Sequence, residues 1–307
     1  VQLIENWEKV INSYSQDYTA EYEVFISGSN ASLLSGELAT LLTGRYVGFN
    51  VFPYSYREYC QVTGIVPGKA TFINYLSGGG LPELFNLPDD EVRHHYVQAL
   101  KNTILMKDIV VKYNIKDASL LESLFSFIVQ NMCNPVSVTN IVNYFRNLKV
   151  ITSFNTLSSY LKYLEQTFLL HVVPRYDLKG KKILGGTRKY YLNDLAFRNI
   201  LFSEFEPGLG YLLENLVFLE FKRNGYEVLT GAERNMEIDF MIKKGGIIKY
   251  VQVCYILADE NVIQREFGNL ESIKDNWEKM VISLDDISLG NRNGIKHYPA
   301  WNPEIYQ

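Results

Sequence analysis

The pattern of the last third of the chain constrains the fold most. From Gly208 onward, apolar residues recur at helical spacing in two stretches and in strand-like runs in four. Gly225 is placed to end the first helix, and Gly245 and Gly246 supply a turn between two strands. The predicted elements, in chain order, are a helix (211–224), three strands (226–229, 237–242 and 247–255), a helix (261–272) and a strand (279–284). This order predicts an α/β domain over residues 208–307.

Two acidic residues in this domain stand in apolar surroundings. Glu214 lies in an apolar helical run and Asp239 lies within the second strand. A buried carboxylate is costly unless it binds a cation or a hydrogen-bond donor. Gln252 and Cys254 are two residues apart on the third strand and therefore share one face. This arrangement resembles the PD-(D/E)XK nuclease-like fold, in which acids hold a divalent metal and a lysine assists the attacking water.

The resemblance predicts Glu214 and Asp239 as metal ligands and, with Gln252, as a degenerate nuclease-like catalytic site. It departs from the pattern at Cys254, which occupies the position of the lysine. Lys249 has the wrong strand parity to replace it; Lys243 or Arg265 could do so. A thiol carries no positive charge, so nuclease activity is not the favoured function. The alternative is that Glu214 and Asp239 pair with Lys or Arg inside the domain.

The pattern of residues 117–200 predicts a separate domain. Two helices (119–133 and 138–147) are separated by Pro135 and by Ser137, a helix-capping residue; Ser153 can cap a third helix at 156–166. Two strands (169–174 and 189–192) follow, joined by a polar loop. Three helices followed by a two-stranded wing are typical of a winged helix-turn-helix.

The charge of this region favours contact with nucleic acid. Residues 140–200 hold ten basic and three acidic residues, a net charge of +7, whereas the whole chain has a net charge of −4. Such a patch suits phosphate contacts with double-stranded DNA. A solvated loop or a winged helix that binds only protein remains the alternative. The predicted nucleic-acid-binding residues are Lys179, Lys181, Lys182, Arg188 and Lys189.

The first 70 residues alternate between helix and strand patterns. A helix (7–15), a strand (22–27), a helix ending near Gly44 and a strand (46–52) predict part of a parallel α/β sheet. Ser27 and Ser29 follow the first strand, where nucleotide-binding proteins place groups that sense phosphate, and Arg45 could stabilise phosphate charge. The P-loop motif G-x-x-x-x-G-K-[ST] does not occur in the sequence, so ATP hydrolysis by this chain is not expected.

Eleven short motifs extend these observations. They are QLIENWEKV (2–10), VFISGS (24–29), LTGRY (42–46), PYSYREY (53–59), GGLPE (79–83), KDI (107–109), YLND (191–194), EN (214–215), EIDF (237–240), QVCY (252–255) and REF (265–267). In this order they resemble prokaryotic AAA-type ATPases that carry the C-terminal domain of unknown function 4143. The resemblance implies a P-loop half upstream of Val1, which makes that ATPase segment the expected partner, and ATP and Mg²⁺ as cofactors of the full-length protein. No cofactor is expected for this chain.

The interpretation is thus an α/β multidomain chain: a partial AAA-type α/β remnant (1–70), a helical connector (71–116), a winged helix-turn-helix (117–200) and a nuclease-like α/β domain (208–307). By the resemblance, Ser27, Ser29 and Arg45 are the ATP sensor-like residues. Three scattered cysteines suggest a reducing compartment, and no apolar run is long enough to span a bilayer. A cytoplasmic location without membrane contact is therefore expected.

Overall fold

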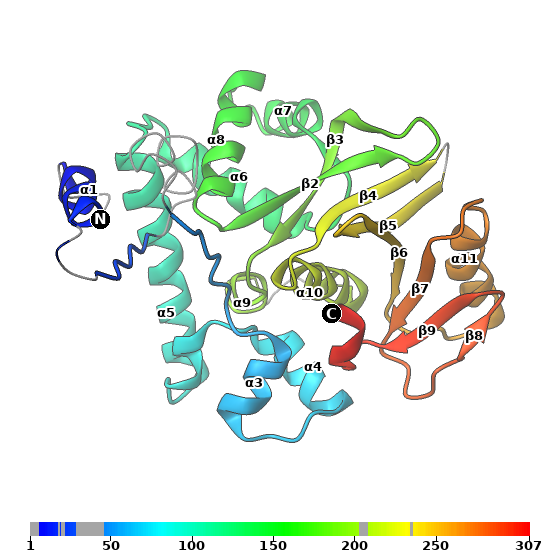
Figure 1. Cartoon of the computed structure of the whole chain (residues 1–307). Helices are drawn as coiled ribbons and strands as arrows, with labels where there is room; N and C mark the ends of the chain where they lie inside the picture. The colour runs from blue at the N-terminus through cyan, green and yellow to red at the C-terminus, as the bar shows by residue number, and fades with distance from the viewer. Residues whose placement is uncertain (1–5, 18, 20–21, 29–45, 203–207, 234–235) are drawn as a thin grey trace.

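A computed structural model describes residues 6–17, 19, 22–28, 46–202, 208–233 and 236–307. Its strands form one mixed nine-stranded sheet in the order β1-β3-β2-β4-β5-β6-β7-β9-β8 (Figure 1). The strands are β1 (Val136–Ser137), β2 (Leu170–Asp177), β3 (Lys182–Leu192), β4 (Glu227–Glu233), β5 (Met236–Lys244), β6 (Ile247–Cys254), β7 (Glu278–Ser283), β8 (Asn291–Arg292) and β9 (Ile295–Pro299).

Helices surround this sheet. The α-helices are α1 (Trp7–Gln16), α3 (Tyr56–Thr63), α4 (Lys69–Gly78), α5 (Asp90–Thr103), α6 (Ala118–Gln130), α7 (Val138–Asn147), α8 (Phe154–Gln166), α9 (Ala196–Asn199), α10 (Leu209–Arg223) and α11 (Glu260–Glu271). Two 3-10 turns, η2 (Pro82–Phe85) and η4 (Pro303–Tyr306), and a π-helical stretch, η3 (Ile104–Val111), complete the described elements. The model is a mixed α/β protein.

The central helices begin where the sequence predicts. The Ser137 hydroxyl accepts a hydrogen bond from the backbone N–H of Asn140 at the start of α7, and the Ser153 hydroxyl accepts one from Thr156 at the start of α8. These caps satisfy N–H groups that the first helical turn leaves without partners. The antiparallel strands β2 and β3 follow, and β1, which the sequence did not predict as a strand, pairs with β3.

The sheet continues from this region into the C-terminal domain. β2 pairs in parallel with β4, from Arg175 opposite Thr230 to Asp177 opposite Ala232. The predicted helix, three strands, helix and strand of the C-terminal domain are all present as α10, β4, β5, β6, α11 and β7. The β2–β3 hairpin is therefore attached along one edge to the C-terminal strands and does not project alone.

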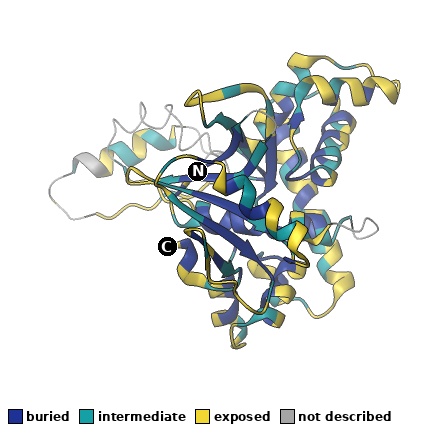
Figure 2. Cartoon of the chain, turned by 90° about the vertical axis from the view of Figure 1, so that its right-hand side faces the viewer, coloured by how far each residue is buried: buried dark blue, intermediate teal, exposed yellow. Residues whose placement is uncertain are grey.

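Helix α10 is the centre of the core. Every residue from Leu212 to Phe221 is buried, because α10 is apolar around most of its circumference and lies near the centre of the fold (Figure 1). Figure 2 shows that buried residues gather in the interior of the molecule. It belongs to a core that also includes side chains of α6 and α8, while α11 packs on a second core with β5 and β6. Polar residues within α10 must consequently find partners inside the protein.

The first 70 residues differ from the prediction. α1 is present, but residues 22–28 and 46–52 form no strand in the described structure. A strand requires hydrogen bonds from a neighbouring chain, and the described residues place none beside them. Apolar side chains here are exposed: 83% for Phe25 and 94% for Val51. The helix predicted to end near Gly44 lies outside the described residues.

Candidate functional site

A buried lysine and three acids form the most concentrated charge cluster around α10. Lys189, on β3, places its Nζ 3.0 Å from Glu214 Oε1 on α10, 2.9 Å from Glu237 Oε1 and 3.7 Å from Asp239 Oδ1, both on β5. Only 4% of the Lys189 side chain is exposed, compared with 10% for Glu214 and 13% for Asp239. We call these four residues the Lys189 cluster.

Further hydrogen bonds complete the Lys189 cluster. The hydroxyl of Tyr191 donates to Glu214 Oε1 at 2.7 Å, and the backbone N–H of Val253 donates to Asp239 Oδ2 at 2.8 Å. Burial and the nearby charge of Glu214 raise the pKa of Asp239 to about 8. Burial alone would lower the pKa of Lys189, but the carboxylates of Glu214, Asp239 and Glu237 together raise it above the ordinary value. Lys189 is therefore an ammonium ion in this cluster.

Glu214, Asp239 and Gln252, the predicted catalytic residues, lie close together in the structure. Gln252 is buried, and its Oε1 accepts a long, 3.4 Å hydrogen bond from the backbone N–H of Asp239. Cys254 lies further along β6, and its thiol donates to the carbonyl of Ile256. Burial, followed by the charge of Glu266, raises the pKa of the Cys254 thiol to about 11, so it is protonated near neutral pH.

The cation beside the acids is not one of the two candidates that the sequence suggested. Lys243 places its Nζ over the ring of Tyr176, 5.1 Å from the centroid, and Arg265 pairs with its neighbour Glu266. Lys189 was predicted to contact DNA, but it is buried against the acids and is not available to a phosphate. A signal for this existed in the sequence: Lys189 directly precedes the apolar run Tyr190 to Leu192, which is buried.

An open cavity of about 540 Å³ lies beside the Lys189 cluster, between the start of α10, the end of β6 and α11. Glu214, Cys254, Arg265 and Glu266 contribute to its wall. In the described part of the chain, no group of three or more His, Cys, Asp or Glu side chains is arranged to hold a metal ion. Glu214 and Asp239, the predicted metal ligands, face Lys189 instead.

The other predicted basic residues are exposed to solvent. Lys179, Lys181, Lys182 and Arg188 are exposed on the β2–β3 hairpin, and so are Arg146, Lys149 and Lys162 on or beside α7 and α8. We call these seven residues the basic surface. Of the remaining bases in 140–200, Arg198 is buried and Arg175 approaches Glu237 at 3.7 Å. The basic surface is therefore the part of the predicted positive charge that solvent or a ligand can reach.

Of the predicted ATP sensor-like residues, Ser27 is described and is exposed, while Ser29 and Arg45 lie outside the described residues.

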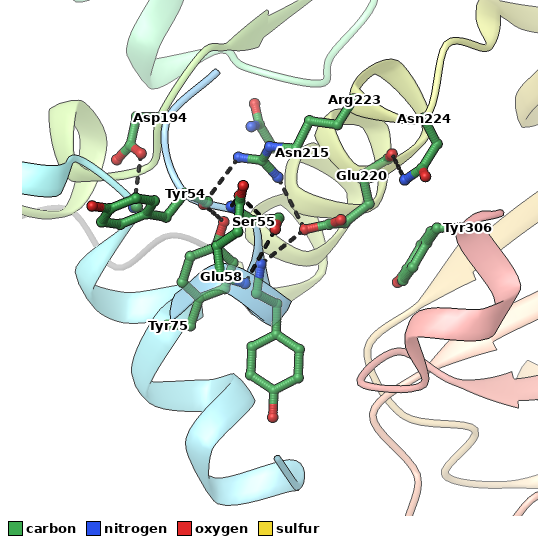
Figure 3. Close-up of polar contacts among 12 residues, drawn as sticks. Tyr54, Ser55, Glu58, Tyr75, Asp194, Asn215, Glu220, Arg223, Asn224 and Tyr306 are labelled. Carbon is green, nitrogen blue, oxygen red and sulfur yellow. Dashed lines mark hydrogen bonds and ion pairs between the residues drawn. The ribbon is translucent and has the colours of Figure 1, made fainter. Parts of the chain in front are cut away.

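A second polar network joins residues 54–56 to α10 (Figure 3). The backbone N–H of Tyr56 donates to Glu220 Oε1 at 3.2 Å, and Arg223 donates to the same oxygen at 2.9 Å and to the carbonyl of Tyr54 at 3.3 Å. The hydroxyl of Tyr75 also donates to the Tyr54 carbonyl. We call this the α10 junction.

Two glycines extend the α10 junction to Asp194. The N–H of Tyr54 donates to the carbonyl of Gly80, and the N–H of Gly80 donates to Asp194 Oδ2 at 2.8 Å. A Cβ on Gly79, whose φ is +80°, would collide with the Asp194 carboxylate and the N–H of Ala196. Burial raises the pKa of Asp194 to about 6, against its hydrogen bonds from Ala196 and Gly80. Three of the motifs noted in the sequence, at 53–59, 79–83 and 191–194, thus meet here.

Comparison with known proteins gives two family matches within the chain. Residues 1–60 match the AAA domain, and residues 69–207 match a domain of unknown function, DUF8612. The latter differs from the domain of unknown function that the motifs suggested. None of the described helices has both the length and the apolar character needed to cross a membrane.

Two curated relatives align with most of the chain. An uncharacterized protein of Haemophilus influenzae is 33% identical over 287 residues, which cover 92% of this chain and 70% of that protein. An uncharacterized protein of Methanocaldococcus jannaschii is 27% identical over 305 residues, covering 94% of this chain and 66% of that protein. No solved structure matches the chain. The chain belongs to the family of the Haemophilus influenzae protein, and its residues 1–60 are similar to the AAA domain.

Proposed function

We propose that this chain serves an AAA-type ATPase as its DNA-binding part, and that residues 117–200 act as a winged helix on double-stranded DNA. The match of residues 1–60 to the AAA domain supports the first half of the proposal. The basic surface supports the second half. That the whole protein has a nucleotide-dependent activity is likewise a proposal.

The observation that carries DNA binding is the exposure of bases on α8 and on the β2–β3 hairpin. In a winged helix, the third helix enters the major groove and the wing contacts the adjacent backbone. α8 buries Leu157, Tyr160, Leu161 and Leu164 against the core. Its outward residues include Asn155, Ser159 and Lys162, which can donate to phosphates or to base edges.

The hairpin supplies the charge that a wing would need. Lys179, Lys181 and Lys182 cluster at its tip, and Arg188 is exposed on β3. Asp177 stands beside them, but its Oδ1 accepts a backbone hydrogen bond from Lys179, which holds the turn in shape. The lysine side chains at the tip remain exposed for phosphate oxygens.

Binding of a labelled duplex measures this proposal directly. The double substitution Lys181→Glu and Lys182→Glu is expected to weaken binding at least tenfold, because two attractive phosphate contacts become repulsive. The matched control is Lys116→Glu with Lys274→Glu, which makes the same change of net charge at exposed lysines outside the basic surface. Equal losses in both variants would mean that only net charge matters and would contradict a site on the hairpin.

A protein-binding role is the second candidate, and a different surface favours it. The turn between α7 and α8 exposes several apolar side chains: Ile151 is 98% exposed and Phe154 is 53% exposed, and Leu148 is also exposed. Exposed apolar patches of this kind mark contacts with other proteins. Substitution of Ile151 and Phe154 by Ser should then abolish partner binding and leave duplex binding intact. If duplex binding falls with these substitutions while no partner is lost, the turn belongs to the DNA site.

A further inference from the structure

The Lys189 cluster lies where the nuclease-like resemblance implies a divalent metal. Glu214 comes from the helix that opens the C-terminal domain, and Asp239 comes from its second strand, as that resemblance requires. Lys189 comes from outside this domain, on β3 of the preceding region. Whether a metal fits depends on which acid oxygens are still available.

The acid oxygens that point into the cluster already accept hydrogen bonds or pair with the ammonium of Lys189. Lys189 Nζ lies 3.0 Å from Glu214 Oε1, 2.9 Å from Glu237 Oε1 and 3.7 Å from Asp239 Oδ1. Glu214 Oε1 also accepts from the hydroxyl of Tyr191, and Asp239 Oδ2 accepts from the backbone of Val253. A magnesium ion needs six oxygen ligands at about 2.0–2.1 Å in octahedral geometry. An ion bridging the three acids would have to stand where the ammonium stands.

Electrostatic repulsion, like the lack of room, argues against a metal ion in the cluster. All three acids pair with the buried ammonium of Lys189, and Arg175 approaches the second carboxylate oxygen of Glu237 at 3.7 Å. A divalent ion bridging the acids would lie within a few ångströms of the charge of Lys189, whose side chain is only 4% exposed. Such like-charge contacts are costly where the effective dielectric constant is low. The residues present therefore do not fit the metal that the resemblance implies.

We infer that Lys189 is the resident cation of this cluster: its ammonium replaces the divalent metal and fastens the β2–β3 hairpin to the C-terminal domain. Since Arg188 and Lys189 are adjacent on a strand, their side chains leave it on opposite faces. Arg188 is exposed in the basic surface while Lys189 is bound to the acids. The hairpin thus carries one exposed base, Arg188, that an external ligand can reach, and one buried base, Lys189, that pairs with the acids of the cluster.

Manganese binding tests the inference, with electron paramagnetic resonance of free Mn²⁺ as the readout. Wild type and Asp239→Asn are expected to give identical titrations, because no metal reaches the acids in either protein. Lys189→Met removes the ammonium but keeps the length of the side chain. It is expected to bind Mn²⁺ about tenfold or more tightly than wild type, and Lys189→Met with Asp239→Asn should lose that gain.

A wild-type protein that binds Mn²⁺ in a manner abolished by Asp239→Asn would overturn the inference, because metal and ammonium would then coexist. A folded Lys189→Met variant with no gain in affinity would also overturn it. If Lys189→Met does not fold, the wild-type and Asp239→Asn titrations still decide the matter. A control variant, Lys182→Met on the same strand, should titrate like wild type because Lys182 is exposed.

Discussion

Arg188 and Lys189 are adjacent bases on β3 and have opposite environments. Arg188 is exposed, whereas Lys189 lies among Glu214, Glu237 and Asp239. The strand backbone produces this difference, since neighbouring side chains alternate between faces. The same alternation explains part of why a local count of charges overestimated the basic surface: the count included Lys189, which is buried on β3. It also included Arg198, which is buried on helix α9. At the residue scale, burial and pairing decide which charges can act.

Loss of Lys189 should destabilise the protein strongly. Lys189→Met leaves three neighbouring acids without their ammonium partner, and removing one partner of a buried ion pair typically costs about 3–5 kcal/mol. Urea unfolding of Lys189→Met is expected to show a loss of this order. Adding Glu214→Gln should restore part of it, and Lys182→Met should change stability by less than about 0.5 kcal/mol. A Lys189→Met protein as stable as wild type would contradict the burial and pairing described here.

A substitution at Gly79 tests the close backbone packing at the α10 junction. Its φ of +80° is a conformation that residues with a Cβ rarely adopt, and a Cβ there would collide with Asp194. Gly79→Ala should therefore lower the free energy of unfolding by about 2 kcal/mol or more. Gly78→Ala is the matched control, because a Cβ at Gly78 meets nothing within 4 Å. Equal effects of the two substitutions in thermal denaturation would count against this close packing.

α10 is the element through which the parts of the chain are connected. Near its beginning, Glu214 receives hydrogen bonds from Lys189 and Tyr191 of β3. In the next residue, the side-chain amide of Asn215 donates to the carbonyl of Leu192 and accepts from its N–H. Near its end, Glu220 and Arg223 hold the backbone of residues 54–56. α10 therefore bonds the end of the segment that matches the AAA domain to the strand that carries Arg188.

Glu220 should fix the start of α3 to α10. Glu220→Ala removes the acceptor of the Tyr56 N–H and leaves the buried guanidinium of Arg223 without its acid, at a cost of about 2–4 kcal/mol. Hydrogen exchange is expected to rise most at residues 54–59, more than in β5 or β6. Glu227→Ala, at an exposed position on β4, is the control. Equal exchange rates at residues 54–59 in wild type and in Glu220→Ala would refute this connection.

The sequence predicted elements best where one local pattern was sufficient. The capped helices α7 and α8 and the strands β4 to β7 follow from apolar spacing, Ser caps and glycine turns. β9 was missed because Ile295 to Pro299 alternates apolar and polar residues weakly, and its parallel pairing with β7 depends on the tertiary fold. The site was predicted in part: Glu214 and Asp239 stand out as acids in apolar runs. Lys189 was misplaced, because no local pattern joins β3 to α10.

At the scale of the whole molecule, acidic pH should lower stability through His171. Burial, followed by the charges of Lys222 and Arg223, lowers the pKa of His171 to about 4, although the hydrogen bond to Asn193 opposes this. The unfolded chain binds the proton more readily, with a pKa of about 6.5, so the stabilising contribution of neutral His171 is present above that pH. This contribution, at most about 3 kcal/mol, is lost as pH falls from about 6.5 to about 4.

The pH dependence of urea unfolding checks this expectation. His171→Gln should flatten the curve over this range, whereas His95→Gln, at an exposed histidine, should leave it as in wild type. Identical pH curves for wild type and His171→Gln would show that the stability lost on acidification comes from other groups.

The whole account depends most on duplex binding by the basic surface. The most direct measurement is the slope of log affinity against log salt concentration for one duplex. Each phosphate contact contributes about 0.9 to this slope. We predict a steep negative slope for wild type and for Lys116→Glu with Lys274→Glu, and a slope reduced by about 2 for Lys181→Glu with Lys182→Glu. Affinity that is absent, or that responds to salt equally in all three proteins, would contradict the account.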